Sequence, residues 1–313
     1  MSTNLRREIT GSLGISDLQI NRIITRSPYA YKTYSINKKS GGKRIISQPA
    51  KETKFIQRWL VENVFSKLPI HQSVTAYRAG SSIKKNASIH KNNKYFAKFD
   101  FKDFFTSIRS DDLIAHLNKY LSDKYSYEEI MDIARISCKK NKRSGKLFLT
   151  IGAPSSPIIS NTVLFDFDTL LYSWCCQNNI TYTRYADDLT FSTNEKESTK
   201  NIEKNIRSII RAIEYPRLII NSKKTVHLSK KSQIRITGLI IDNNKNVSIG
   251  RKRKREISSL IHSFSLGALP NDEVYRLQGL LGFANDSEPQ FLERMRSKYS
   301  SEKIDNILKI RKQ

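Results

Sequence analysis

The chain has 313 residues, and 38% of them are hydrophobic, which supplies enough apolar material for a folded core and excludes a disordered polypeptide. Its 55 lysine and arginine residues against 29 aspartate and glutamate residues give a formal net charge of +26. Such an excess favours a polyanionic partner, with nucleic acid first and an anionic membrane surface as the rival.

The cysteines and the N-terminal residues indicate a compartment. Cys138, Cys175 and Cys176 are odd in number and fit neither a disulfide framework nor a C-x2-C metal pair, so a reducing environment is expected. Residues 1–10 lack the apolar run of a signal peptide, and no run of 18 apolar residues occurs in the chain. We therefore expect a cytoplasmic protein without a membrane segment.

Helices and strands alternate through the first half of the chain. Apolar residues at helical spacing predict helices over 16–25 and 53–67. Between them, two strand-like runs over 31–36 and 43–49 predict a hairpin with a basic, glycine-rich turn at 37–42. Next come a buried strand over 95–101, a helix from Asp111, a helix over 126–138 and a short strand over 145–151.

The second half begins with a predicted long helix over 155–177, which has serine at its start. Two strand-like halves over 180–193 then flank Ala186-Asp187-Asp188. They are followed by a helix over 195–213, strands near 217–220 and 225–228, a hairpin over 234–249 that turns at 242–245, and basic helices from Arg251 onward. Strands in the middle, with helices between and after them, indicate an α+β fold with a helical C-terminal lobe.

The clearest chemical signal is Tyr185-Ala186-Asp187-Asp188. Adjacent aspartates also serve as ordinary turn formers, and that alternative stays open for the dipeptide alone. Asp100 ends a strand among phenylalanines, where a carboxylate needs a partner. If the two strands are neighbours, Asp100, Asp187 and Asp188 converge and can hold two divalent cations for in-line phosphoryl transfer. The alternative for Asp100 is a helix cap or an internal ion pair.

Five motifs occur in a fixed order, namely FDFKDFF, GAPSSP, YADD, INSKKT and ITGL. Together they resemble the polymerase core of reverse transcriptases over about residues 30 to 250. The resemblance implies a right-hand polymerase fold with fingers, an antiparallel-sheet palm and a helical thumb. Its expected limits are N-terminal helices and fingers over 1–94, palm over 95–108, continued fingers over 109–153, palm with the YADD hairpin over 154–247, and a basic RNA-binding thumb over 248–313.

Two further motifs resemble the bacterial retron reverse transcriptases within this family. Residues 86–90, Asn-Ala-Ser-Ile-His, match the N-A-x-x-H signature of that group. Residues 236–238, Ile-Thr-Gly, differ by one conservative change from its V-T-G signature. Neither motif is expected of a retroviral enzyme, so the resemblance favours the retron group.

The resemblance implies roles for four residues at the catalytic centre. Asp100, Asp187 and Asp188 correspond to the catalytic carboxylates, which bind two Mg2+ ions and accept Mn2+ as a substitute. Lys224 corresponds to the lysine that protonates the departing pyrophosphate, although spacing alone leaves Lys223 open.

The resemblance also implies a nucleotide site. Phe105 corresponds to a steric gate whose ring excludes a 2′-hydroxyl. The alternative is that Phe105 is a core phenylalanine; if Phe105 is not buried, Phe104 beside it must be. Residues 149–152, Leu-Thr-Ile-Gly, replace the usual Leu-Pro-Gln-Gly, so contact with the nucleotide is expected to differ. The predicted nucleotide-binding residues are Lys43 and Arg44, which suit phosphate oxygens but are surface charges by default, with Phe101, Phe105, Gly152 and Ser156.

Two groups of residues are predicted to contact RNA. The first is the basic run Arg251, Lys252, Arg253, Lys254 and Arg255, for which a solvated charge run is the alternative. The second is Asn86 and His90 of the retron signature, for which a structural histidine capping a helix is the alternative.

The predicted function is RNA-directed DNA synthesis on a cognate structured non-coding RNA, primed from an internal guanosine 2′-hydroxyl and yielding a branched RNA–DNA, msDNA. The resemblance implies deoxynucleoside triphosphates as substrates and a separately encoded effector in antiphage defence. The alternatives are a group II intron-like or diversity-generating reverse transcriptase, and an RNA-binding assembly protein with a vestigial polymerase site. The membrane rival lacks an amphipathic anchor.

Overall fold

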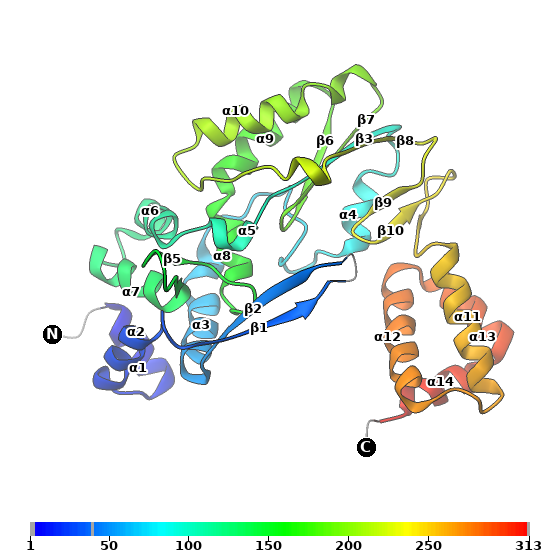
Figure 1. The fold of residues 1–313 in the computed structure, drawn as a ribbon, viewed down its shortest axis with the longest axis horizontal. Helices are drawn as coiled ribbons and strands as arrows, with labels where there is room; N and C mark the ends of the chain where they lie inside the picture. Colours follow the sequence, from blue (N-terminus) through cyan, green and yellow to red (C-terminus); the bar gives the residue numbers. More distant parts are fainter. Residues whose placement is uncertain (1–3, 39–40, 312–313) are drawn as a thin grey trace.

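Four antiparallel strands form the central sheet in the computed structural model, which describes residues 4–38 and 41–311 (Figure 1). Their order is β6 (Thr181–Tyr185), β7 (Asp188–Thr193), β3 (Tyr95–Asp100) and β8 (Val226–Ser229). The two predicted halves of 180–193 are confirmed as β6 and β7. The predicted strand near 217–220 is wrong, since only Ile220 makes an isolated bridge, to Phe101.

Alternation along β3 and β7 gives the sheet two different faces. Ala97, Phe99 and Phe191 lie on the face packed against the larger hydrophobic core. Asp100 and Asp188 are direct partners across the strands and lie on the opposite face. A one-residue shift would exchange these sets, so the buried phenylalanines set the register that pairs the two aspartates.

Three helices cover the phenylalanine-bearing face, namely α8 (Ser156–Val163), α9 (Phe165–Gln177) and α10 (Ile202–Ala212). The predicted single helix over 155–177 is wrong, because the chain leaves helical geometry at Leu164 (φ −91°, ψ 11°). The preceding Ser-Asn-Thr-Val run has low helix propensity, which favours a break there. α10 begins at Ile202 and not near 195, because a 3-10 turn over Glu197–Thr199 precedes it.

The N-terminal region combines helices with a two-stranded hairpin. α1 (Asn4–Leu13), α2 (Asp17–Arg26) and α3 (Lys51–Asn63) pack with α6 (Ser110–Leu121) and α7 (Tyr127–Ser137), and a reciprocal Ser16–Gln19 capping box starts α2. The predicted hairpin is confirmed as β1 (Tyr31–Asn37) and β2 (Lys43–Pro49); part of its predicted turn, residues 39–40, lies outside the described residues. Small elements complete the region: η1 (Phe65–Lys67), α5 (Phe104–Ser107), β4 (Lys139–Lys140) and β5 (Leu147–Phe148).

The C-terminal lobe comprises a small sheet and four helices. The sheet order is β11 (Val247–Ser248), β10 (Leu239–Ile241) and β9 (Ile234–Ile236), followed by α11 (Arg251–Ser265), α12 (Asn271–Ser287), α13 (Pro289–Tyr299) and α14 (Ser301–Lys309). The predicted single hairpin over 234–249 is wrong, because a second turn at Thr237-Gly238 makes three strands. Both residues have positive φ (46° and 88°).

The C-terminal lobe has its own hydrophobic core, which includes buried residues of β9, β10 and the four helices. Two residues from outside the lobe enter it, Phe96 of β3 and Ala87 of α4 (Ile83–Ile89). In Figure 1, α4 lies between the central sheet and strands β9 and β10. Every helix in the described part of the chain is too short or too polar to cross a bilayer.

Candidate active site

Three aspartates meet where β3 ends and the β6–β7 hairpin turns. Asp100 is the last residue of β3 and faces Asp188, the first residue of β7. Asp187 occupies the two-residue turn between the paired Tyr185 and Asp188, and its carbonyl accepts a hydrogen bond from the Phe101 N–H at 3.2 Å. The predicted convergence of the three residues is therefore present.

Burial and like charges disfavour the ionised forms of two of these carboxyls. Burial, followed by the charges of Asp188 and Asp100, raises the pKa of Asp187 to about 6. Burial also raises the pKa of Asp188, with the Asp100 charge adding to it and Lys98 opposing it. A cation bound nearby would stabilise the ionised forms of these carboxyls.

Lys224 already supplies one positive charge to this cluster. Its Nζ donates to both carboxylate oxygens of Asp100 at 2.9 Å. Burial alone would lower the pKa of Lys224, but the hydrogen bond and charge of Asp100, with Asp187 and Asp188, raise it overall. The 3-10 turn η3 (Ser222–Lys224) brings Lys224, and not Lys223, into an ion pair with the Asp100 carboxylate. The internal ion pair considered for Asp100 is also present.

The carboxylates suit a hard divalent cation in the chemistry of their oxygen donors. In residues 4–38 and 41–311, however, no group of three or more histidine, cysteine, aspartate and glutamate side chains is spaced as a ready metal site. In this structure the Lys224 ammonium donates to both oxygens of Asp100. The donor set fits a divalent cation once that ion pair yields.

A hollow of about 390 Å³ contains three of the predicted nucleotide-binding residues, Phe105, Gly152 and Ser156. Phe105 is half-buried and borders the hollow, whereas Phe104 is 4% exposed and lies in the core. This is the burial pattern that a gate at Phe105 requires. The same hollow is lined by Tyr77, Lys54 and Arg58.

Gly152 has a packing role that the resemblance did not imply. At φ 112° it adopts a backbone conformation that favours glycine, and a Cβ there would lie 3.0 Å from Ile46 Cγ2 and 3.1 Å from the Ser47 carbonyl oxygen. The Ser47 N–H donates to the Ile151 carbonyl at 2.8 Å, so this turn lies directly on β2. Ser156 is buried, and its Oγ accepts from the Thr150 N–H at 3.3 Å. The close backbone approach at Gly152 is thus to β2 of the same chain.

Phe101 requires a correction. The predicted nucleotide contact of Phe101 cannot be made by its ring in this structure, because the ring is 2% exposed and stacks on Phe104 at a centroid distance of 5.8 Å. Lys43 and Arg44 are exposed at the start of β2 and lie outside the residues that line the hollow.

Tyr77 is a site residue that the sequence analysis missed. It is 49% exposed with φ 54°, and it lines the hollow beside Phe105. Burial, followed by the charge of Asp187, raises its pKa, whereas Arg44 lowers it. The charges that act on Tyr77 therefore include Asp187 in the YADD turn and Arg44 in the β1–β2 hairpin.

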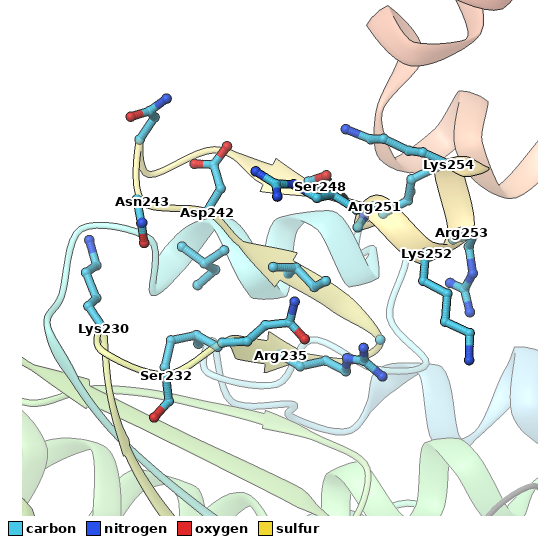
Figure 2. A pocket seen from close by; sticks show the side chains of 18 of the residues that line it. Lys230, Ser232, Arg235, Asp242, Asn243, Ser248, Arg251, Lys252, Arg253 and Lys254 are labelled. Atoms are coloured by element: carbon cyan, nitrogen blue, oxygen red, sulfur yellow. Dashed lines mark hydrogen bonds between the residues drawn. The ribbon is translucent and has the colours of Figure 1, made fainter. Parts of the chain in front are cut away.

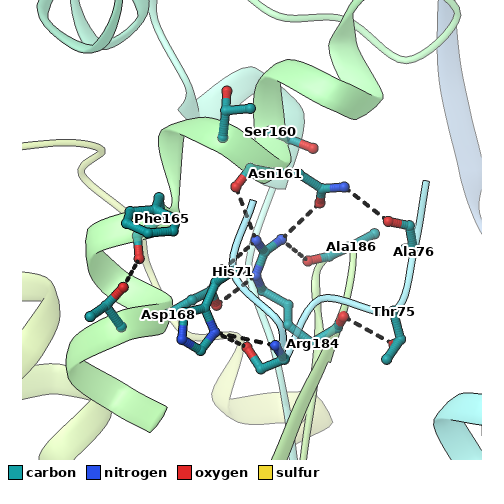
Figure 3. A network of polar contacts seen from close by, with 12 residues as sticks. His71, Thr75, Ala76, Ser160, Asn161, Phe165, Asp168, Arg184 and Ala186 are labelled. Carbon is teal, nitrogen blue, oxygen red and sulfur yellow. Dashed lines mark hydrogen bonds and ion pairs between the residues drawn. The ribbon is translucent and has the colours of Figure 1, made fainter. Parts of the chain in front are cut away.

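A buried arginine, which the sequence analysis also missed, bonds to the YADD turn (Figure 3). Arg184 in β6 is fully buried and pairs with Asp168 of α9, with Nη2–Oδ2 at 2.6 Å and Nε–Oδ1 at 2.9 Å. Its Nη1 donates to the Ala186 carbonyl at 3.3 Å, at a residue with φ 58°. A charged residue in a strand otherwise expected to be buried was the available signal, because such a group requires a partner.

Asn86 and His90 require a second correction. Both side chains have 0% exposure, so the prediction that they contact RNA directly is wrong for this structure. His90 is the C-cap residue of α4, and both of its ring nitrogens bond to hydroxyls of the central sheet. The structural alternative holds for both residues.

The basic run 251–255 forms the first turns of α11 and contributes to a hollow of about 1130 Å³ beside β9–β11. Figure 2 shows Lys230 and Arg235 around the same hollow as Arg251–Lys254. Not every member is free to bind a ligand: Lys254 pairs with Glu288 at 2.6 Å, and Arg253 lies over the Phe283 ring. Arg251, Lys252 and Arg255 are exposed.

Comparisons with known proteins agree with this geometry. The family model described as reverse transcriptase (RNA-dependent DNA polymerase) matches residues 36–241, which include the three aspartates and Lys224. The chain is therefore an RNA-directed DNA polymerase with the right-hand fold of that class, and the α+β prediction is confirmed. Among solved structures, the telomerase of Candida albicans in complex with a telomeric RNA fragment aligns with 93% of this chain and 62% of that chain, at 13% identity and a TM-score of 0.49.

Similar proteins of known type narrow the family to one group of reverse transcriptases. The chain is 39% identical to the retron Ec83 reverse transcriptase of Escherichia coli over 89% of this chain and 90% of that protein. It is 34% identical to the retron Ec73 enzyme of the same species over 89% and 90%, and 28% identical to the retron Mx162 enzyme of Myxococcus xanthus over 83% and 58%. The chain belongs to the retron reverse transcriptases.

Proposed function

We propose that this chain copies one cognate, structured non-coding RNA into DNA, starting from an internal guanosine 2′-hydroxyl, so that the product is branched msDNA. The relationship to retron reverse transcriptases supports this choice over a group II intron-like or diversity-generating enzyme. The observation that carries the catalytic part of the proposal is the convergence of Asp100, Asp187 and Asp188 beside Lys224.

In the proposed chemistry the three aspartates hold two Mg2+ ions, or Mn2+ in their place. Such ions activate the attacking hydroxyl and stabilise the leaving group during in-line phosphoryl transfer. Asp187, whose pKa lies near 6, is ionised at neutral pH and available as a ligand. Asp100, which pairs with Lys224 in this structure, would pair with such a cation in its place.

Lys224 is the proposed proton donor to the departing pyrophosphate. The hydroxyl attacks the α-phosphorus, the bond from that phosphorus to the bridging oxygen breaks, and the pyrophosphate oxygen gains negative charge and then a proton. The raised pKa keeps Lys224 protonated at neutral pH. Its exposed position, with 58% of the side chain accessible, leaves it able to move from Asp100 toward the leaving group.

The remaining residues are assigned to nucleotide or RNA contacts from their position at the hollow or from their exposed positive charge. Phe105 lies under the incoming sugar, while Gly152 and Ser156 shape the turn beside it. Lys43 and Arg44 bind the triphosphate from the exposed start of β2. Arg251, Lys252 and Arg255 contact RNA phosphates, with Arg253 and Lys254 at the same helix end. A separately encoded effector in antiphage defence and a cytoplasmic location complete the proposal.

The test is to express the chain together with its native upstream DNA and to size the small nucleic acids after ribonuclease treatment. A discrete single-stranded DNA that retains a branched ribonucleotide and disappears in Asp187→Asn supports the proposal. If no such DNA appears while purified protein extends a primed RNA template, the priming proposal falls and the polymerase remains. An RNA-binding protein without synthesis in either assay would support the assembly-protein alternative.

A further inference from the structure

Both retron signatures converge on one short helix, α4. Residues 86–90 occupy its second half and C-cap. Thr237 of the Ile-Thr-Gly signature donates from Oγ1 to the carbonyl of Ile83, the first residue of α4, at 3.3 Å. Two motifs separated by about 150 positions in the chain therefore meet at the same element.

One face of α4 is bonded to the hairpin that carries the catalytic aspartates. His90 Nδ1 lies 2.7 Å from Ser192 Oγ in β7, and its Nε2 lies 2.7 Å from Thr183 Oγ1 in β6. Thr183 Oγ1 also donates to Asn86 Oδ1 at 2.7 Å, and Ser192 Oγ accepts from Asn93 Nδ2 at 2.7 Å.

Donor and acceptor counting gives this chain of bonds a single direction. Thr183 uses its only proton toward Asn86, so His90 Nε2 must donate to Thr183. A neutral imidazole carries only one ring proton, so with Nε2 protonated its Nδ1 is an acceptor, and Ser192, which accepts from Asn93 through a lone pair, donates its own proton to His90 Nδ1. The neutral imidazole, protonated on Nε2, satisfies both contacts, and burial lowers the pKa of His90 to about 3, which keeps it neutral.

The other side of α4 belongs to the C-terminal lobe. Ala87 is fully buried in the core of that lobe, and Ile83 packs against the same core. α4 contacts β9, β10, β11 and α12 in addition to β6. Its small alanine lets the helix approach the lobe, while its polar side chains bond to the central sheet.

We propose that the two retron signatures form a joint that fixes the C-terminal lobe relative to the YADD hairpin. Asn86 and His90 act as positioning residues through Thr183 and Ser192, Thr237 acts through its bond to Ile83, and none of the three touches RNA or nucleotide. Thr183 and Ser192 share a sheet face with Asp188, so movement of α4 is transmitted to the catalytic side of the sheet. The consequence for synthesis rests on the proposed function, because it assumes that the lobe holds the RNA.

The first test measures the joint without RNA. Spin labels are placed on the exposed native Cys176 at the end of α9 and on a cysteine introduced by Ser259→Cys on the exposed side of α11, and their distance distribution is recorded. Thr183→Val keeps the side-chain size but removes the acceptor of His90 and the donor of Asn86. We expect this variant and Thr237→Val each to shift or broaden the distribution.

A matched control removes a hydroxyl from within the lobe. Ser258→Ala breaks the Ser258–Tyr299 contact of 3.0 Å, which does not cross to the central sheet, and should leave the distribution unchanged. Unchanged distributions in both Thr183→Val and Thr237→Val, with circular dichroism showing folded protein, would overturn the proposal. Since no RNA is present, this result does not depend on whether the proposed priming reaction occurs.

The second test connects the joint to synthesis. On a short annealed RNA–DNA primer–template, Thr183→Val should retain the rate of single-nucleotide addition but lose long products made in one binding event. Thr237→Val should show the same pattern, and Ser258→Ala should resemble the parent chain. An equal loss of single-nucleotide addition and of long products would place Thr183 in the catalytic step itself and contradict a positioning role.

Discussion

Arg184 and Arg251 show how differently one residue type is used in two regions of this molecule. Arg184 lies in the central sheet with 0% exposure, and its charge is balanced by Asp168. Arg251 starts α11, is exposed and borders a wide basic hollow. The buried, bonded Arg184 holds the YADD turn in position, whereas the exposed Arg251 remains available to a polyanion. The net charge of +26 is spread along the whole chain.

The largest effect is expected from removing charge at the catalytic edge. The double variant Asp187→Asn, Asp188→Asn should lower DNA synthesis by roughly 10³-fold or more, because metal-assisted stabilisation of phosphoryl transfer is worth several kcal/mol and each ~1.4 kcal/mol is tenfold in rate. Primer extension measures the loss. RNA affinity, measured by filter binding, should stay near that of the parent chain, and a parallel loss of affinity would mean that the two regions are not separable.

Breaking the buried Arg184–Asp168 ion pair tests how much this pair stabilises the fold around the YADD turn. Asp168→Asn leaves Arg184 buried without a counter-charge, which should lower the free energy of unfolding by about 3–5 kcal/mol. Urea denaturation followed by circular dichroism provides the measurement. The control is Glu197→Gln, which breaks the solvent-exposed Lys200–Glu197 pair and should leave the unfolding curve unchanged. Equal behaviour of the two variants would contradict the distinction between buried and exposed charge.

Lys224 and Lys223 offer a comparison between adjacent residues. Lys224→Gln removes the proposed proton donor and should lower the rate of nucleotide addition by about 10²-fold, the lower end of general acid catalysis. Lys223→Gln removes an exposed charge one residue away and should change the rate little. Rapid-quench kinetics across pH distinguishes the roles, because loss of a general acid also removes the decline in rate at high pH. A Lys223 effect as large as that of Lys224 would reject the assignment.

His90 allows the buried network to be tested by pH. Its pKa falls from the ordinary 6.5 to about 3 in the folded chain, so the unfolded state binds the extra proton first. Stability from this group is fully present above pH 6.5 and is lost as pH falls, by up to about 1.4 kcal/mol per pH unit. Between pH 6.5 and 5, the free energy of unfolding should therefore decline less steeply in His90→Gln than in the parent chain. Identical slopes would mean that His90 is accessible to protons in the folded state.

The two-residue turn predicted that Asp187 and Asp188 lie together, but their convergence with Asp100 depended on β3 and β7 being neighbours, and their catalytic role came from the resemblance to reverse transcriptases. Other features depended on tertiary packing. The burial of Asn86 and His90 requires knowing that α4 packs on β6 and β7, and the role of Gly152 requires the position of β2. The ion pair of Asp100 with Lys224 and not with Lys223 followed from a 3-10 turn, whose direction spacing does not reveal. Arg184 was accessible to sequence reasoning, since an arginine in a buried strand calls for an acidic partner.

RNA binding by the exposed basic residues of the C-terminal lobe should depend strongly on salt concentration. Affinity for folded RNA should fall linearly with salt on a log–log scale, and Arg251→Ala should reduce the slope by about 0.7 to 0.9 if Arg251 neutralises one phosphate. Lys254→Ala should reduce it less, because Lys254 is already paired with Glu288 and a phosphate contact would have to break that pair. Fluorescence anisotropy over a salt series gives both slopes. Equal slope changes would mean that the Lys254–Glu288 pair opens when RNA binds, so that a charge with a partner in the free protein can still join the interface.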